Sequence, residues 1–296
     1  MKTIGRFAPS PSGPLHFGSL VAALGSYFSA KSQGGDWLVR MEDIDPPREI
    51  EGASDLILKA LETYHLYWDG DVLYQSERHD AYQQQIDSWL DSGLAYYCQC
   101  TRKQIKESGG FYLGTCRDKA LNSPNSCSVR VRVDTPIVSF EDLKHGNMSI
   151  PPELAAEDFI IKRRDGLFAY NLAVVLDDIY QGITEVVRGA DLIEPTGRQI
   201  SLYKMLGLDP VKYLHLPLAT DGNGNKLSKQ NHATAIDLKH PVPTLVRAMR
   251  FLGFALPRGI QNGEISEIID WGVKNWSINQ LPQEIEITSP FSKASP

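Results

Sequence analysis

The apolar positions near the start of the chain follow the spacings of strands and helices in turn. A short apolar run at 3–8 predicts a strand, and the apolar residues from Leu20 to Phe28 recur at the helical interval of three to four residues. The run 37–41 predicts a second strand, and the apolar positions of 53–61 share one face of a second helix. Strands that alternate with helices predict a parallel sheet covered by helices.

The loops after the two predicted strands, 9–14 and 42–47, are rich in proline, serine and acidic residues. In open parallel sheets, ligands bind in the crevice beyond the carboxyl ends of the strands. Both loops therefore lie where a site is expected.

The pattern changes after a helix predicted at 77–93. Strand candidates follow at 129–133 and 137–140, and the alternation of strands and helices resumes at Asp158. The last part of the chain has helical periodicity. We therefore expect an α/β fold in four parts: the first half of a sheet domain at 1–93, an inserted subdomain at 94–150, the second half of the sheet domain at 151–235 and a helical C-terminal region at 236–296.

The composition indicates a protein of the cell interior. The chain has 296 residues, of which 42% are hydrophobic, so it can bury a substantial core. Its net charge of −6 argues against binding to nucleic acid mainly by bulk electrostatics, and the short basic run 162–164 is typical of a solvated surface. The N-terminus lacks the apolar run of an export signal, and no apolar stretch is long enough to span a bilayer. We expect a cytoplasmic protein with no membrane partner.

All four cysteines lie close together in the sequence, at Cys98, Cys100, Cys116 and Cys127. In a reducing compartment such a cluster indicates a metal site rather than a disulfide framework, with free structural thiols as the alternative. A closed tetrahedral zinc site needs four ligands, and spacing alone favours Cys127 as the fourth.

The loop and helix start at 9–18, Pro-Ser-Pro-Ser-Gly-Pro-Leu-His-Phe-Gly, form the strongest motif for chemistry. Glycine lets a nucleotide approach the backbone closely, and amides at a helix N-terminus favour anions. The imidazole of His16 at that end can donate a hydrogen bond to a phosphate.

A second motif, Lys226-Leu227-Ser228-Lys229-Gln230, follows a glycine-rich loop. A lysine there can neutralise charge that develops on phosphorus in a transition state. Each motif alone is typical of a turn or a surface, but the pair indicates a nucleotide site. A dinucleotide-binding enzyme is disfavoured, because no Gly-x-Gly-x-x-Gly opens a helix after a strand.

The pair of motifs resembles the His-Ile-Gly-His and Lys-Met-Ser-Lys-Ser signatures of class I aminoacyl-tRNA synthetases. The strings at 6–13 and 40–45 are similar to the glutamyl branch of that class, and the resemblance extends from about residue 4 to residue 235. Ser19 replaces the second signature histidine and Gln230 the last serine. The resemblance implies a Rossmann-like parallel sheet domain with an inserted zinc-bearing subdomain, and ATP with Mg²⁺ as cosubstrate.

The resemblance also implies roles for particular residues. Arg6 would pair with the side-chain carboxylate of glutamate, Ser10 and Glu42 would hold its α-amino group, and Tyr170 and Arg188 would complete the pocket. These residue types suit the ligand, because guanidinium groups bind carboxylates and a carboxylate binds an ammonium; the alternative is that Arg188 and Glu42 form structural ion pairs. The full implied set is Arg6, Phe7, Ala8, Pro9, Ser10, Glu42, Tyr170 and Arg188 for glutamate, Ser12, His16, Gly18, Ser19 and Lys229 for ATP, and His16, Lys226 and Lys229 for catalysis.

For the metal, the resemblance implies a pattern Cys-x-Cys…Tyr-x-x-x-Cys. Its ligands would be Cys98, Cys100, Tyr112 and Cys116, with Tyr112 in place of Cys127. The zinc ion would have a structural role.

Only a short segment follows Lys229, and the large helical domain with which full-length glutamyl-tRNA synthetases read the anticodon does not fit in it. The pattern resembles a shortened branch that activates glutamate without tRNA and attaches it to queuosine at the wobble position of tRNA(Asp). The implied partners are ATP, L-glutamate and the tRNA(Asp) anticodon stem-loop that carries queuosine. Charging of a tRNA 3′ end and RNA binding without catalysis are the alternatives, and the retention of His16 and Lys229 argues against the latter.

Overall fold

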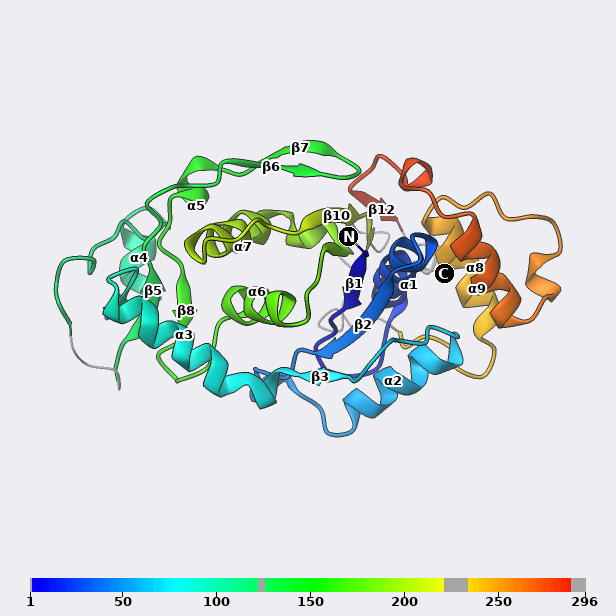
Figure 1. The fold of residues 1–296 in the computed structure, drawn as a ribbon, viewed down its shortest axis with the longest axis horizontal. Helices are drawn as coiled ribbons and strands as arrows, with labels where there is room; N and C mark the ends of the chain where they lie inside the picture. Colours follow the sequence, from blue (N-terminus) through cyan, green and yellow to red (C-terminus); the bar gives the residue numbers. More distant parts are fainter. Residues whose placement is uncertain (1, 122–125, 221–233, 289–296) are drawn as a thin grey trace, which may run out of the picture.

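A parallel sheet forms the centre of the molecule, whose computed structural model describes residues 2–121, 126–220 and 234–288 (Figure 1). β1 pairs in parallel with β2, and β2 with β3. A 2.9 Å hydrogen bond from the Thr184 amide to the Ile4 carbonyl oxygen places β9 beside β1, and β9 pairs in parallel with β10. The predicted parallel sheet is therefore confirmed. Its strands are, in spatial order, β3 (Leu73–Tyr74), β2 (Asp36–Met41), β1 (Ile4–Phe7), β9 (Glu185–Gly189) and β10 (Lys212–Leu216).

Helix α1 (Phe17–Ser32) covers one face of this sheet and is itself covered by two C-terminal helices, α8 (Pro241–Phe251) and α9 (Ile265–Lys274) (Figure 1). Leu20, Leu24 and Phe28 are fully buried in the resulting core. A helix between two layers is apolar on more than one side, which explains the dense apolar run at 20–30.

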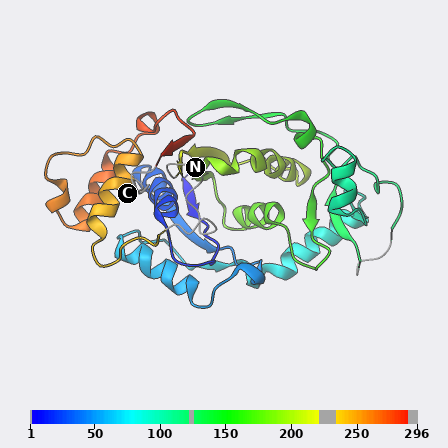
Figure 2. The ribbon, with the colours of Figure 1, turned by 180° about the vertical axis from the view of Figure 1, so that it is seen from behind.

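Helices α6 (Tyr170–Tyr180) and α7 (Ile193–Met205) lie on the opposite side of the sheet from α1 (Figures 1 and 2). Both contribute apolar residues to cores that lie away from α1, including Leu172, Ile200 and Leu202. The sheet is thus a middle layer between helices, as the alternation of strands and helices predicts.

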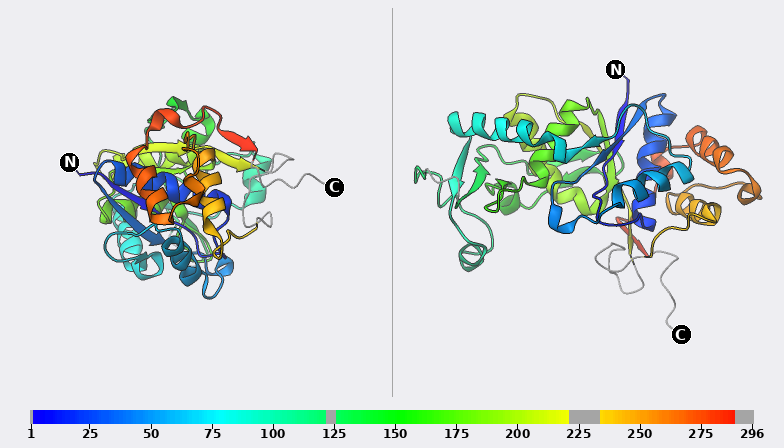
Figure 3. Two further views of the ribbon diagram at one scale, coloured as in Figure 1. Left: turned by 90° about the vertical axis from the view of Figure 1, so that its right-hand side faces the viewer. Right: turned by 90° about the horizontal axis from the view of Figure 1, so that it is seen from below.

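A second sheet lies at the end of the molecule farthest from α8 and α9 (Figures 1 and 3). It is antiparallel and takes strands from distant parts of the chain: β4 (Ala95–Cys98), β5 (Ser128–Val131) and β8 (Ile160–Lys162). Helices α3 (His79–Asp91) and α4 (Arg102–Glu107) lie beside it. One of its strands therefore comes from beyond residue 150, the expected end of the inserted segment.

A long hairpin, β6 (Ser139–Asp142) and β7 (Gly146–Ser149), returns from this end to the central sheet (Figure 1). β6 pairs in parallel with β10 at Asp142 and Tyr213. The segment 94–150 thus contributes to both sheets, and its division from the rest of the chain stays a prediction.

The C-terminal region is mainly helical, but its last described residues form a strand, β12 (Glu286–Thr288), that pairs in parallel with β11 (Leu218–Thr220). The remaining helices are α2 (Ala53–Thr63) and the short α5 (Pro152–Ala155). Within the described ranges, no helix combines the length and the apolar character needed to cross a bilayer.

Gly25 of α1 packs against the Leu216 side chain of β10, and we predict that Gly25→Ala destabilises the protein. A Cβ there would lie 2.4 Å from Cδ1 of Leu216. Alanine normally stabilises a helix interior by about 1 kcal/mol relative to glycine, so a loss of about 1–2 kcal/mol in the free energy of unfolding, measured in urea, would report the clash. In the double variant with Leu216→Ala, the two losses should be clearly less than additive. Simple additivity would contradict the contact.

Candidate active site

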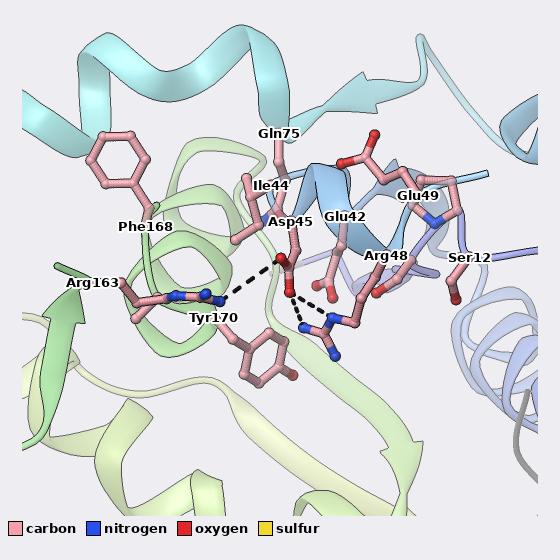
Figure 4. Close-up of a pocket in the computed structure, with 13 residues that line it drawn as sticks. Ser12, Glu42, Ile44, Asp45, Arg48, Glu49, Gln75, Arg163, Phe168 and Tyr170 are labelled. Atoms are coloured by element: carbon pink, nitrogen blue, oxygen red, sulfur yellow. Dashed lines mark hydrogen bonds and ion pairs between the residues drawn. The ribbon is translucent and has the colours of Figure 1, made fainter. Parts of the chain in front are cut away.

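A cleft of about 500 Å³ opens beyond the carboxyl ends of β1 and β2 and against the start of α6 (Figure 4). Its lining includes residues expected at the site: Ser10, Ser12, Glu42 and Tyr170. The lining also includes apolar and charged side chains: Ile44, Asp45, Arg48, Glu49, Arg163 and Phe168. The cleft lies where ligands bind in open parallel sheets.

Beneath this cleft, the buried carboxylate of Asp178 lies between two guanidinium groups. Its Oδ1 accepts a 3.1 Å hydrogen bond from Nε of Arg6 on β1 and a 2.8 Å hydrogen bond from Nη2 of Arg40 on β2. All three side chains are 5% exposed or less. Burial by itself raises the pKa of Asp178, but Arg6 and Arg40 hold it below its ordinary value. Helix α6 is thereby tied to the ends of two neighbouring strands.

Glu42 directly follows β2 and points into the cleft (Figure 4). Its Oε1 lies 3.9 Å from Nη2 of Arg40. Burial raises the pKa of Glu42 to about 7, although Arg40 and Arg6 lower it. Near neutral pH this carboxyl is therefore only partly ionised, and an ammonium group of a ligand would favour its charged form.

Tyr170 begins α6, lines the cleft and separates it from Arg188 on β9. Nη1 of Arg188 donates to the Tyr170 hydroxyl at 3.4 Å, and Nη2 donates to Thr196 Oγ1 at 2.8 Å. Burial raises the pKa of Tyr170, against the effect of Arg188, so the hydroxyl stays protonated. Neither Arg6 nor Arg188 lines the cleft: Arg188 lies behind Tyr170, and Arg6 acts on Glu42 through its charge.

The motif loop joins β1 to α1. The expected residues therefore lie at the end of β1, in this loop and in the first turn of α1: Phe7, Ala8, Pro9, Ser10, Ser12, His16, Gly18 and Ser19. His16 is the N-cap of α1: its Nδ1 accepts from the Ser19 amide at 3.2 Å, and its Nε2 lies 3.0 Å from the Ser19 hydroxyl. Because Nδ1 accepts, the neutral ring carries its proton on Nε2 and can donate it. Ser19, which stands at the position of the second signature histidine, thus contacts His16, the first signature histidine.

Lys226 and Lys229 lie outside the described residues. The chain that follows them returns to the motif loop, where Ala235 forms a β-bridge with His16. The Ile236 amide donates to the Leu15 carbonyl oxygen at 3.0 Å. The segment that follows the second motif therefore contacts the first motif directly through its backbone.

Three of the four cysteines come together at the end of β4. The sulfur atoms of Cys98, Cys100 and Cys116 all lie within 4.8 Å of one another. Among the described residues, this group does not include Cys127, which is buried elsewhere. Three converging thiols suit a metal such as zinc, which takes thiolate ligands in structural sites.

Tyr112 lies at the same cluster. Its hydroxyl accepts a 2.8 Å hydrogen bond from the Cys116 amide and is in hydrogen-bonding contact with the Cys98 side chain. The guanidinium of Arg130 lies over the Tyr112 ring, 3.8 Å from its centre. Burial raises the pKa of the Tyr112 phenol, so metal binding there would have to compensate for deprotonation.

Two important contributors were not recognised in the sequence: Asp178 and Arg40. The signal for Asp178 was two acidic residues, at 177 and 178, inside the otherwise apolar stretch 172–180. A carboxylate is rarely buried without a partner, so a paired role for it could have been predicted, although not the identity of the partners.

The chain matches the family model for the catalytic domain of the class I tRNA synthetases (E and Q) over residues 2–287. It is 69% identical over 295 residues to the Glutamyl-Q tRNA(Asp) synthetase of Vibrio vulnificus strain CMCP6, with coverage of 100% of this chain and 96% of that protein. The protein of the same name from Escherichia coli O6:H1 is 55% identical over 293 residues, with coverage of 99% and 94%.

Among solved structures, a glutamate tRNA ligase from Elizabethkingia meningosepticum CCUG26117, in complex with its amino acid, superposes with a TM-score of 0.80. The match covers 98% of this chain and 68% of that chain at 23% identity. At that identity the likeness concerns the fold alone.

The charge arrangement beneath the cleft predicts that Asp178→Asn costs about 3–5 kcal/mol of unfolding free energy, because it removes the carboxylate that the buried guanidinium groups of Arg6 and Arg40 share. The control is Asp36→Asn, which breaks the exposed Lys2–Asp36 pair and should cost less than about 1 kcal/mol. Because the folded-state pKa of Asp178 is lowered, the difference from wild type should be full above pH about 4 and shrink as the pH falls below that value. Equal losses in the two variants would contradict this role.

Proposed function

The chain belongs to the class I tRNA synthetases for glutamate and glutamine, and from that premise we propose that it activates L-glutamate with ATP and transfers the glutamyl group to queuosine of tRNA(Asp). The observation that carries this proposal is the 55–69% identity, over nearly the full length of both chains, to relatives named for that reaction. This reaction needs a site that binds an amino acid, a nucleotide and a polynucleotide.

Glutamate would lie against the wall of Ser10, Glu42 and Tyr170, with Phe7, Ala8 and Pro9 forming the adjoining backbone. Glu42 suits the α-ammonium group, and Arg6 and Arg188 behind the wall supply positive charge for the carboxylates. Glutamine offers one carboxylate fewer, so it would interact less favourably with this positive charge.

ATP would lie over the loop between β1 and α1. Ser12 faces the cleft, and Gly18 and Ser19 lie in the first turn of α1, where the helix dipole favours phosphate. His16, with its proton on Nε2, can donate to a phosphate oxygen. Lys226 and Lys229 would neutralise phosphate charge, and Mg²⁺, when bound with ATP, would supply further neutralisation.

Two displacements account for the reaction. A glutamate carboxylate oxygen attacks the α-phosphorus, pyrophosphate leaves, and the glutamyl-adenylate forms. A hydroxyl of the cyclopentene-diol of queuosine then attacks the carbonyl carbon of the adenylate, the proton leaves the hydroxyl, and AMP is released. Positive charge fixed in a partly water-excluded cleft would stabilise the negative charge that develops in both steps.

The modified base would bind against Ile44 and Phe168 in the cleft lining. Bases splayed out of RNA loops commonly stack on aromatic rings and on guanidinium planes, and the Arg163 guanidinium also lines the cleft (Figure 4). Asp45 holds Arg163 at 3.8 Å and Arg48 at 2.5 Å, so both cations stay at the mouth of the cleft.

The thiol cluster would hold a structural zinc ion through Cys98, Cys100 and Cys116, with Tyr112 as the fourth ligand. Such an ion would tie the end of β4 to the loop after α4 and stabilise that part of the molecule. We place the reaction in the cytoplasm, where its tRNA substrate is found.

The acceptor is tested by transfer of labelled glutamate, with ATP, to tRNA from cells that make queuosine and from cells that do not. Label should enter only the first pool, and it should do so equally when the 3′-terminal adenosine has been removed, because the acceptor is the base. Lys229→Ala should slow the transfer by about 10²-fold or more. Label in both pools that is lost with the terminal adenosine would instead establish charging of a 3′ end. No transfer by the wild-type protein, with RNA binding unchanged in Lys229→Ala, would support a binding protein.

The role of Glu42 predicts a pH dependence of glutamate recognition. With a pKa of about 7, its ionised fraction rises roughly tenfold between pH 6 and pH 8, so the KM for glutamate in ATP–pyrophosphate exchange should fall about tenfold over that range. Glu42→Gln should raise this KM at pH 8 and remove its pH dependence, while the KM for ATP stays unchanged. A steep pH profile retained in Glu42→Gln would assign the titration to another group.

A further inference from the structure

A continuous line of buried polar groups runs from the hairpin β6–β7 to the cleft. Asp142, at the end of β6, has its Oδ2 2.8 Å from Nδ1 of His215 on β10. Nε2 of His215 accepts a 3.3 Å hydrogen bond from Nε of Arg188, whose Nη1 donates to the Tyr170 hydroxyl at 3.4 Å. Asp142, His215 and Arg188 are all 5% exposed or less, and Tyr170 lines the cleft.

The partners of His215 determine where its proton lies. Nδ1 faces a carboxylate that only accepts, so it must donate. Nε2 faces the N–H of a guanidinium that only donates, so it must accept. A neutral imidazole with its proton on Nδ1 satisfies both contacts, and the other tautomer satisfies neither. Asp142 thus selects the His215 tautomer whose Nε2 can accept the hydrogen bond from Arg188.

Asp142 is itself held firmly. Its Oδ1 accepts from the amides of Lys144 and His145, both at 2.9 Å, and its Oδ2 accepts from the His215 amide at 3.0 Å. The carboxylate therefore closes the β6–β7 turn and pairs it with β10 by the same set of contacts. The hairpin thereby places the Asp142 carboxylate in a fixed position beside Nδ1 of His215.

Arg188 is oriented by contacts on most of its nitrogens. Nε is taken by His215, and Nη2 donates to Thr196 Oγ1 and to the Leu192 carbonyl oxygen. The Nη1 end is thereby turned toward Tyr170 and the cleft. Loss of the acceptor at His215 would free the guanidinium to rotate about the contacts on Nη2.

We propose that His215, held in one tautomer by Asp142, is a positioning residue that directs Arg188 and, through it, the Tyr170 hydroxyl toward bound glutamate. This inference rests on the proposed function, and it extends the determinants of glutamate recognition to the β6–β7 hairpin. It predicts that the acceptor at the Nε2 position matters for glutamate and not for ATP.

The test compares two variants of His215 in the full chain. The side-chain oxygen of Gln reaches the position of Nε2, so His215→Gln should keep the acceptor for Arg188 and a glutamate KM within about threefold of wild type. Asn reaches only the position of Nδ1, so His215→Asn should bind glutamate about tenfold or more weakly, with the KM for ATP unchanged. Glutamate affinity by calorimetry and both KM values by ATP–pyrophosphate exchange are the readouts.

Ser29→Ala is the matched control, because it removes a buried 2.6 Å hydrogen bond to Glu185 on the same strand as Arg188. It should lower the unfolding temperature without changing the KM for glutamate. Wild-type glutamate affinity in His215→Asn overturns the inference, as does a parallel loss for glutamate and ATP in both variants. If His215→Asn does not fold, a raised glutamate KM in folded His215→Gln overturns it. Wild-type protein that binds glutamate but gives no exchange overturns the proposed function alone.

Discussion

The structure depends most on one carboxylate, that of Asp178, which neutralises Arg6 and Arg40 where β1 and β2 meet helix α6. Two guanidinium groups buried side by side repel each other, and each would cost several kcal/mol to remove from water unpaired. With Asp178 between them, the strand ends and the helix are held at one spacing. The cleft opens directly above this contact, so its shape follows from a charge requirement below it.

The need to neutralise these buried guanidinium groups also accounts for the raised pKa of Glu42 in the cleft. Asp178 already neutralises Arg40, so Glu42 receives only part of the stabilisation that a carboxylate beside a guanidinium normally has, and burial raises its pKa. A carboxyl that is half ionised near neutrality is suited to a ligand that brings its own ammonium group. Arg188 is oriented in a comparable way by groups behind it, so that the cleft presents Tyr170 at its surface and keeps the cations beneath.

The part of the molecule beyond the central sheet is connected to the cleft by a strand pair rather than by a flexible linker. Hairpin β6–β7 leaves the region of the thiol cluster and pairs with β10 at Asp142. The Asp142 carboxylate, which closes the turn of this hairpin, also accepts a hydrogen bond from His215. In the proposed function, recognition of the amino acid and the placement of the distal sheet therefore share one structural element.

The sequence by itself determined the parallel sheet, the position of the motif loop between a strand and a helix, and the family, because periodicity and contiguous motifs are local properties of a chain. Only the tertiary structure decided which buried polar side chains meet: Asp178 with Arg6 and Arg40, and His215 with Arg188. It also brought Cys98, Cys100 and Cys116 together without Cys127, and paired β8 with β5 across a distance in sequence that no local pattern records. Such pairings follow from how the layers pack and from the need of each buried charge for a partner, and neither is written in the spacing of residues along the chain.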